Sequence, residues 1–191
     1  MRTVRLIVAG LVWLGLSTNT YAESSPIQLA ENEGQLLHRR LNLDAVAQWS
    51  WTASSWSPAF AKKHTAKVYV VNLWSLTCKP CIEEFPFFKR LVDGWKQNKN
   101  IEFVFVADPP QDNLATDLVA FWKQSAANLP NSPLCRAQSD SIGRDLSNDS
   151  KPLTLILDRN FVVRQAYVGS IVNRSLGSAI ERLLRAESLQ K

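Results

Sequence analysis

The seven residues Val68–Trp74 (VYVVNLW) form a near-continuous apolar run that is rich in β-branched and aromatic side chains. Such a run is typical of a central strand whose two faces are both covered. Ile101–Ala107 and Leu153–Leu157 have the same character. Because helical apolar spacing lies between these runs, the chain is expected to form an α/β fold with a buried sheet.

The order of the remaining elements predicts a mixed sheet with helices on both faces. Helices are expected from Cys78 to about Lys96 and from Asp112 to about Ala127. The pattern further predicts a short strand at Leu134–Ala137 and a short helix at Ser139–Ser147. A strand at Phe161–Val168 is expected to turn back through Asp158–Asn160 and to pair antiparallel with Leu153–Leu157. A last helix, opened by Asn173 or Ser175, is expected to contain Leu176, Ile180, Leu183 and Leu184.

The first 22 residues have the pattern of a signal peptide. Arg2 and Arg5 precede the apolar stretch Leu6–Leu16, and cleavage is expected after Ala22. An uncleaved N-terminal anchor is the alternative, and in both cases the folded part is exported. We therefore expect a signal peptide at 1–22, an N-terminal extension at 23–59 and a folded domain at 60–191.

The extension itself is less clearly patterned. Glu23–Glu33 is polar and is expected to be a flexible leader. Trp49, Trp51 and Trp56 follow among Ser and Thr residues, with strand-like alternation. They indicate either an aromatic ligand platform or, as we favour, an N-terminal hairpin or extension packed on the core.

Composition excludes several classes of protein. The chain has 191 residues and a formal charge of +5, without a basic cluster of the kind that binds nucleic acid. Its three cysteines are too few for a disulfide-stapled miniprotein or a four-cysteine zinc site.

The chemistry-bearing motif is Cys78-Lys79-Pro80-Cys81, where the first clear strand meets the first clear helix. Cysteines three residues apart at a helix start can form a disulfide, and the helix N-terminus favours the thiolate of Cys78. Pro80 is tolerated in a first turn, and Cys81 lies deeper, where it is placed to resolve a mixed disulfide. A permanent disulfide staple is the alternative, although so small a loop would stabilise little. A soft-metal site of Cys78, Cys81 and His64, as in a copper chaperone, is another.

Residues 70–86 (VVNLWSLTCKPCIEEFP) resemble the exported TlpA/ResA branch of the thioredoxin superfamily, and 152–158 (PLTLILD) is similar to a second segment of that branch. The likeness covers about residues 60–189. It implies a thioredoxin-like fold and thiol–disulfide exchange, with Cys78 attacking, Cys81 resolving and a redox disulfide Cys78–Cys81. It also implies a cis peptide bond before Pro152, facing the dithiol.

The same resemblance assigns Glu84 to an acidic position near the dithiol. A partly buried carboxylate there would accept the Cys81 proton, whereas the alternative is a charge on the helix surface. Asn72 stands where thioredoxin itself has a buried aspartate. Pro86 is expected to kink the helix by removing the hydrogen bond to the Ile82 carbonyl.

Three residues depart from the family pattern. Thr77 replaces a tryptophan before the first cysteine, and Lys151 precedes the proline; together with Pro152 they are candidates for contact with clients. Cys135 is extra and is expected to be a quiet, partly buried thiol, with a regulatory or intermolecular role as the alternative.

The resulting hypothesis is an exported reductant of client proteins that contain cysteines or disulfides. Within the superfamily, a proline before the second cysteine, as at Pro80, resembles the reductants more than the strong oxidants, and a membrane-bound thiol donor would supply electrons. No cofactor or metal and no nucleic acid is expected, and the membrane is a partner only if residues 1–22 are retained. A copper chaperone and a non-catalytic binding module with the same fold are the alternatives.

Overall fold

The computed structural model describes residues 26–43, 46–50, 54–58, 65–107, 115–125, 129, 134–137, 146 and 150–189. The expected signal peptide, the three tryptophan side chains of the extension and most of the expected helix at Ser139–Ser147 lie outside what is described. Within the described residues, no helix is both long enough and apolar enough to cross a bilayer.

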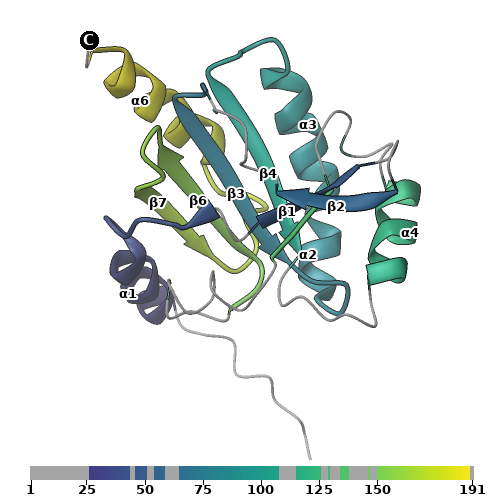
Figure 1. Ribbon diagram of the computed structural model, residues 1–191. Helices are drawn as coiled ribbons and strands as arrows, with labels where there is room; N and C mark the ends of the chain where they lie inside the picture. The colour runs from purple at the N-terminus through teal and green to yellow at the C-terminus, as the bar shows by residue number, and fades with distance from the viewer. Residues whose placement is uncertain are drawn as a thin grey trace, which may run out of the picture.

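Seven strands form one mixed sheet in the order β2-β1-β5-β4-β3-β6-β7. The pairs β3–β4 and β4–β5 are parallel and the other pairs are antiparallel. Figure 1 shows β3 and β4 at the centre of the sheet, with β6 and β7 beside β3. The strands are β1 (Val46–Ser50), β2 (Ser55–Pro58), β3 (Val68–Trp74), β4 (Ile101–Ala107), β5 (Leu134–Ala137), β6 (Leu153–Asp158) and β7 (Val163–Val168).

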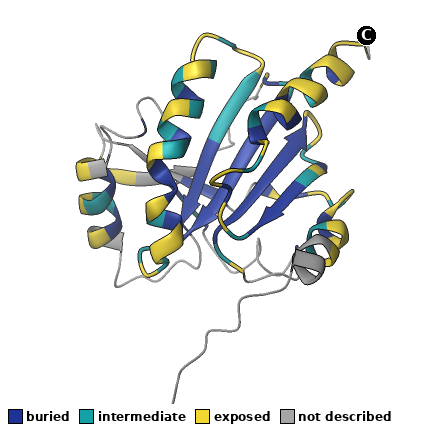
Figure 2. Ribbon diagram, turned by 180° about the vertical axis from the view of Figure 1, so that it is seen from behind, coloured by how far each residue is buried: buried dark blue, intermediate teal, exposed yellow. Residues whose placement is uncertain are grey.

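The two faces of the sheet have separate apolar cores. Alternating residues of β3 enter one core or the other, because successive side chains of a strand point to opposite faces. Helices α2, α3, α4 and α6 contribute to one core, and α1 contributes Leu36 to the other. Figure 2 shows the consequence: the central strands are buried, and exposed residues lie on the outer sides of the helices. The helices are α1 (Pro26–Leu36), α2 (Lys79–Glu83), α3 (Phe85–Trp95), α4 (Ala115–Ser125) and α6 (Leu176–Leu189).

The mixed α/β sheet agrees with the prediction, and β3, β4 and β5 have the predicted bounds. The helix expected from Cys78 to Lys96 is divided at Glu84 into α2 and α3, two residues before Pro86. This is the predicted interruption, since proline cannot donate the backbone hydrogen bond of a continuous helix.

The prediction of a flexible leader over 23–33 was wrong for residues 26–33. Helix α1 starts at Pro26 and packs along β7, as Figure 1 shows. It is held because Leu36 is buried in the core and Glu33 binds groups of the chain far away in sequence. The polar composition of the segment indicates neither the burial of Leu36 nor the distant groups that Glu33 binds.

Strands β1 and β2, within the expected N-terminal extension, pair antiparallel as a hairpin, with Trp49 opposite Trp56. Strand β1 also pairs with β5, so this hairpin extends the central sheet. The backbone therefore has the hairpin arrangement that the sequence favoured.

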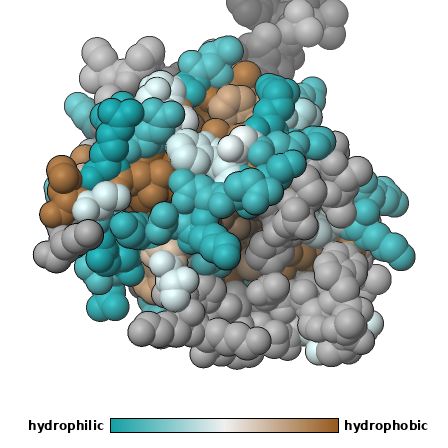
Figure 3. All heavy atoms as spheres, turned by 90° about the horizontal axis from the view of Figure 1, so that it is seen from above, coloured by the Kyte–Doolittle hydropathy of each residue, from teal (hydrophilic) through white to brown (hydrophobic). Residues whose placement is uncertain are grey.

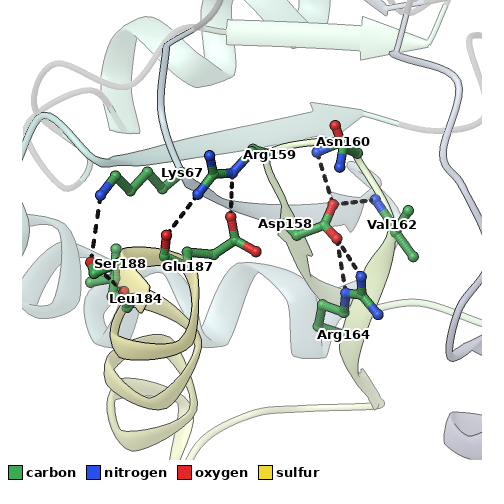
Figure 4. A network of polar contacts seen from close by, with 9 residues as sticks. All are labelled: Lys67, Asp158, Arg159, Asn160, Val162, Arg164, Leu184, Glu187 and Ser188. Atoms are coloured by element: carbon green, nitrogen blue, oxygen red, sulfur yellow. Dashed lines mark hydrogen bonds and ion pairs between the residues drawn. The ribbon is translucent and has the colours of Figure 1, made fainter. Parts of the chain in front are cut away.

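At the end of β6, a polar network fastens the β6–β7 turn and α6 (Figure 4). Asp158 is buried and accepts hydrogen bonds from the N–H groups of Asn160 and Val162, while its other oxygen binds Arg164. Arg159 binds the carboxylate and the carbonyl of Glu187 in α6. This network stabilises the end of the sheet that is remote from Pro152, at the start of β6.

Hydrophilic residues predominate on the face seen in Figure 3, and the hydrophobic ones appear there as separate patches. Among the described residues, the exposed large hydrophobic side chains are Leu37, Val172 and Leu189.

Candidate functional site

The site begins where β3 ends and the chain turns into α2. The Cys78 N–H donates to the Ser75 carbonyl at 3.2 Å, which closes a tight turn. Cys78 is the N-cap residue of α2 with extended backbone angles, and its sulfur accepts the N–H of Cys81 at 3.3 Å. An N-cap position faces the unpaired N–H groups and the positive end of the helix dipole, which stabilise a thiolate.

Cys78 and Cys81 form a disulfide with an S–S distance of 1.97 Å and Cα atoms 5.3 Å apart. The two sulfurs have different surroundings, because the Cys81 residue is 0% exposed whereas Cys78 is only half-buried. Cys78 is therefore the more exposed of the two cysteines.

Lys79 contributes little to the electrostatics of the dithiol. Its ammonium lies 3.7 Å from the Glu83 carboxylate, and both side chains are largely exposed. An exposed i,i+4 ion pair of this kind is worth a few tenths of a kcal/mol and is screened by salt. The Lys79 ammonium is thus paired with Glu83 at the surface rather than with the dithiol.

Glu84 is buried at the junction between α2 and α3, with 0% of the residue exposed. Its Oε1 accepts the Asn72 amide at 2.9 Å and its Oε2 accepts the Ile171 N–H at 3.2 Å. Burial raises the pKa of Glu84 from 4.5 to about 7, although the hydrogen bonds from Ile171 and Asn72 oppose that rise. Glu84 is therefore not a surface charge but a buried carboxyl that changes protonation near neutral pH.

Asn72 links this carboxyl to β6. The second hydrogen of its amide goes to the Thr154 hydroxyl at 3.0 Å, directly across the strand pair. Its carbonyl oxygen Oδ1 is buried without a hydrogen-bond partner among the described residues. Asn72 is thus a pure donor in this arrangement, which favours the ionised form of Glu84 over the neutral form.

Pro152 immediately precedes β6, and the register places the start of β6 beside the end of β3 from which the dithiol turn departs. The Lys151–Pro152 peptide bond is cis, and the Pro152 carbonyl accepts the Gly169 N–H at 2.9 Å. Pro152 is buried and Lys151 is half-buried. Thr77 is exposed in the dithiol turn, where its hydroxyl shares a 3.3 Å hydrogen bond with Ser75.

Cys135 lies in β5 between β1 and β4, and it packs in the core on the other face of the sheet from Cys81. Only 1% of the residue is exposed, and burial, reinforced by the negative charge of Glu102, raises the pKa of its thiol to about 12. A buried neutral thiol is a poor nucleophile.

The described residues contain no group of three or more His, Cys, Asp and Glu side chains that could hold a metal ion. His64, the third ligand of the copper interpretation, lies outside the described residues.

Sequence reasoning missed two groups of the network around Glu84: the backbone donor to Glu84 itself, and the hydroxyl that binds Asn72. The Ile171 N–H and the Thr154 hydroxyl come from segments far along the chain, and neither has a local pattern that marks it. The β3–β6 pairing that brings Thr154 to Asn72 could be inferred only once the sheet order is known.

No protein-family model matches the chain, and a comparison with curated proteins found no significant match. Solved structures do match. A Chlorobium tepidum protein assigned as the thiol:disulfide interchange protein DsbE has a TM-score of 0.55 at 20% identity, over 79% of this chain and 98% of that one.

Two further structures are similar. StoA from Bacillus subtilis has a TM-score of 0.51 at 16% identity, over 72% of this chain and 97% of StoA. A thiol-disulfide isomerase from Corynebacterium glutamicum has a TM-score of 0.51 at 16% identity, over 63% of this chain and 82% of the isomerase. The chain thus has a thioredoxin-like fold, with a Cys-x-x-Cys disulfide at the start of the helix that follows a central strand.

Proposed function

We propose that this protein is a thiol–disulfide oxidoreductase that exchanges electrons with client proteins through Cys78 and Cys81. The observation that supports this most directly is the unequal pair of cysteines: a disulfide at a helix N-terminus that joins a partly exposed Cys78 to a fully buried Cys81. A purely structural staple does not require this asymmetry, and the loop it closes is too small to stabilise the fold much.

The exchange proceeds in two displacement steps. In the reduced protein, the Cys78 thiolate attacks one sulfur of a client disulfide, a mixed disulfide forms, and the client's other sulfur leaves as a thiolate. Cys81 then loses its proton and attacks the Cys78 sulfur. The second client sulfur leaves, the Cys78–Cys81 disulfide forms, and two electrons have passed to the client.

Glu84 is the proposed acceptor of the Cys81 proton. It follows Cys81 by three residues, it is buried at the end of the same helix, and its pKa of about 7 lets it take up and release a proton near neutral pH. While ionised, Glu84 also disfavours a thiolate beside it, so Cys81 remains protonated until the mixed disulfide requires its attack.

We place the protein with the TlpA/ResA-like reductants, exported by means of residues 1–22 and re-reduced by a membrane-bound thiol donor. The sequence motif around the dithiol and the N-terminal signal pattern support this placement. Thr77, Lys151 and Pro152 lie at the end of the sheet where the dithiol turn begins, and we assign client contact to them.

The test is to equilibrate the protein with glutathione buffers and to measure its ability to reduce a protein disulfide. A reductant should have a midpoint more negative than the glutathione couple and should lose two thiols for each client disulfide reduced. A more positive midpoint would contradict the reducing direction. A protein that leaves the client disulfide intact would contradict the function, and Cys135→Ser serves as the matched control that should reduce normally.

A further inference from the structure

The segment between β7 and α6 supplies the backbone donor to Glu84. The Ile171 N–H is bonded to Glu84 at 3.2 Å, and the Ile171 side chain is fully buried in the same core as α2 and α3. The Ile171 carbonyl accepts the Arg174 N–H at 2.9 Å, so residues 171–174 form a turn. The position of this turn fixes the hydrogen bond on the buried carboxyl.

One carboxylate of α1 binds both ends of this segment. Glu33 Oε1 accepts the Val168 N–H at 3.0 Å, at the end of β7. Both oxygens of Glu33 bind the Arg174 guanidinium, at 2.6 and 3.0 Å. Val168 and Arg174 flank Ile171, so Glu33 spans the donor to Glu84 without touching Glu84 itself.

This clamp is partly buried. The Glu33 side chain is 13% exposed, and the Arg174 guanidinium also lies 4.8 Å from the centroid of the Tyr167 ring. A bidentate, partly buried pair is stronger than an exposed ion pair, because water and salt compete with it less. The Glu33–Arg174 pair therefore restrains the position of residues 168–174.

Helix α1 has other attachments that would remain without Glu33. Leu36 is buried in the core, and the His38 N–H donates to the Val163 carbonyl at 2.9 Å. The loss of the Glu33 carboxylate should therefore release the 168–174 segment while α1 stays docked along β7.

We propose that Glu33 and Arg174 are positioning residues for the dithiol site: they hold the Ile171 N–H against Glu84 and thereby let α1 set how firmly the buried carboxyl keeps its proton. The inference rests on the proposed function only for its catalytic consequence, which is the readiness of Glu84 to accept the Cys81 proton.

The direction of the effect follows from the charges that face Glu84. The donors to Glu84 are the Ile171 N–H and the Asn72 amide of β3, and the Asn72 amide also donates to Thr154 of β6. Both hydrogen bonds to Glu84 lower its pKa, whereas burial raises it. From α2, Cys78 and Cys81 are in a disulfide, and Lys79 and Glu83 pair with each other at the surface. A looser Ile171 donor should thus raise the pKa of Glu84 above about 7.

The test is a carboxyl ¹³C NMR titration of the oxidised full chain, with Glu84 assigned by its loss in Glu84→Gln. Glu33→Ala removes both oxygens that bind Val168 and Arg174 and should raise the Glu84 midpoint by about one pH unit, since a hydrogen bond to a charged group is worth that much. Arg174→Gln should raise it in the same direction, and the double variant should add little, because the two residues act as one unit. Glu31→Ala is the matched control: it makes the same change at an exposed position of the same helix and should leave the midpoint unchanged.

An unchanged Glu84 midpoint in folded Glu33→Ala or folded Arg174→Gln would overturn the proposal, as would an equal rise in Glu31→Ala. If Glu33→Ala does not fold, Arg174→Gln decides the question alone. The titration involves no thiol exchange. A protein that fails to reduce clients would therefore refute the proposed function while the clamp could still be measured, and the reverse also holds.

Discussion

The buried carboxyl of Glu84 should make the protein less stable as the pH rises through neutrality. The unfolded chain releases the Glu84 proton around the usual pKa of 4.5, whereas the folded chain keeps it until about pH 7. Between these values the native state binds more protons than the unfolded state, so the free energy of unfolding falls with rising pH. The raised pKa corresponds to about 3 kcal/mol, lost progressively between about pH 4.5 and pH 7.

Glu84→Gln should remove this pH dependence, because the amide has a similar size and no charge to bury. The assay is urea unfolding of the oxidised protein at pH 4, 6 and 8, and the measured quantity is the stability difference between variant and wild type. That difference should grow by about 3 kcal/mol in favour of the variant from pH 4 to pH 8. A difference that does not change with pH would refute the argument, and Glu83→Gln, at an exposed neighbouring position, is the matched control.

Three further predictions concern residues around and away from the site. Cys135→Ser should leave the exchange rate unchanged, and the wild-type Cys135 thiol should react with iodoacetamide only when the protein unfolds, as followed by mass spectrometry. Asn72→Ala removes a donor to Glu84, so NMR titration should show a Glu84 pKa above about 7, and urea unfolding should show a loss of about 1–3 kcal/mol. Arg159→Ala leaves the buried Glu187 carboxylate without its cation and should cost about 1–2 kcal/mol in urea unfolding, with no change in the exchange rate.

The centre of the fold could be predicted from the sequence because its signals are local. The continuous apolar runs define β3 and β4 with their observed bounds, and the interruption of the following helix is explained by Pro86. The Cys-x-x-Cys spacing at a helix start likewise predicts which two sulfurs can join.

The features that were mispredicted or left open depend on distant partners. Helix α1 was expected to be a flexible leader, because its polar composition does not show that Glu33 binds Val168 and Arg174 more than 130 positions away. For Glu84, helical spacing alone allowed either a surface or a buried carboxyl. The donor from Ile171, 87 positions away, is a backbone N–H group. Since nearly every residue type has such a group, the sequence does not indicate which one binds Glu84.

The most direct test of the central claim is to trap the mixed disulfide. Cys81→Ser and Cys78→Ser, each combined with Cys135→Ser so that one reactive thiol remains, are incubated with a protein disulfide, quenched in acid and analysed by intact mass. The Cys81→Ser variant should accumulate a covalent adduct through Cys78, and the Cys78→Ser variant should accumulate little or none, since Cys81 is buried. Equal trapping by the two variants, or trapping through Cys81 alone, would contradict the assignment of Cys78 as the attacking residue.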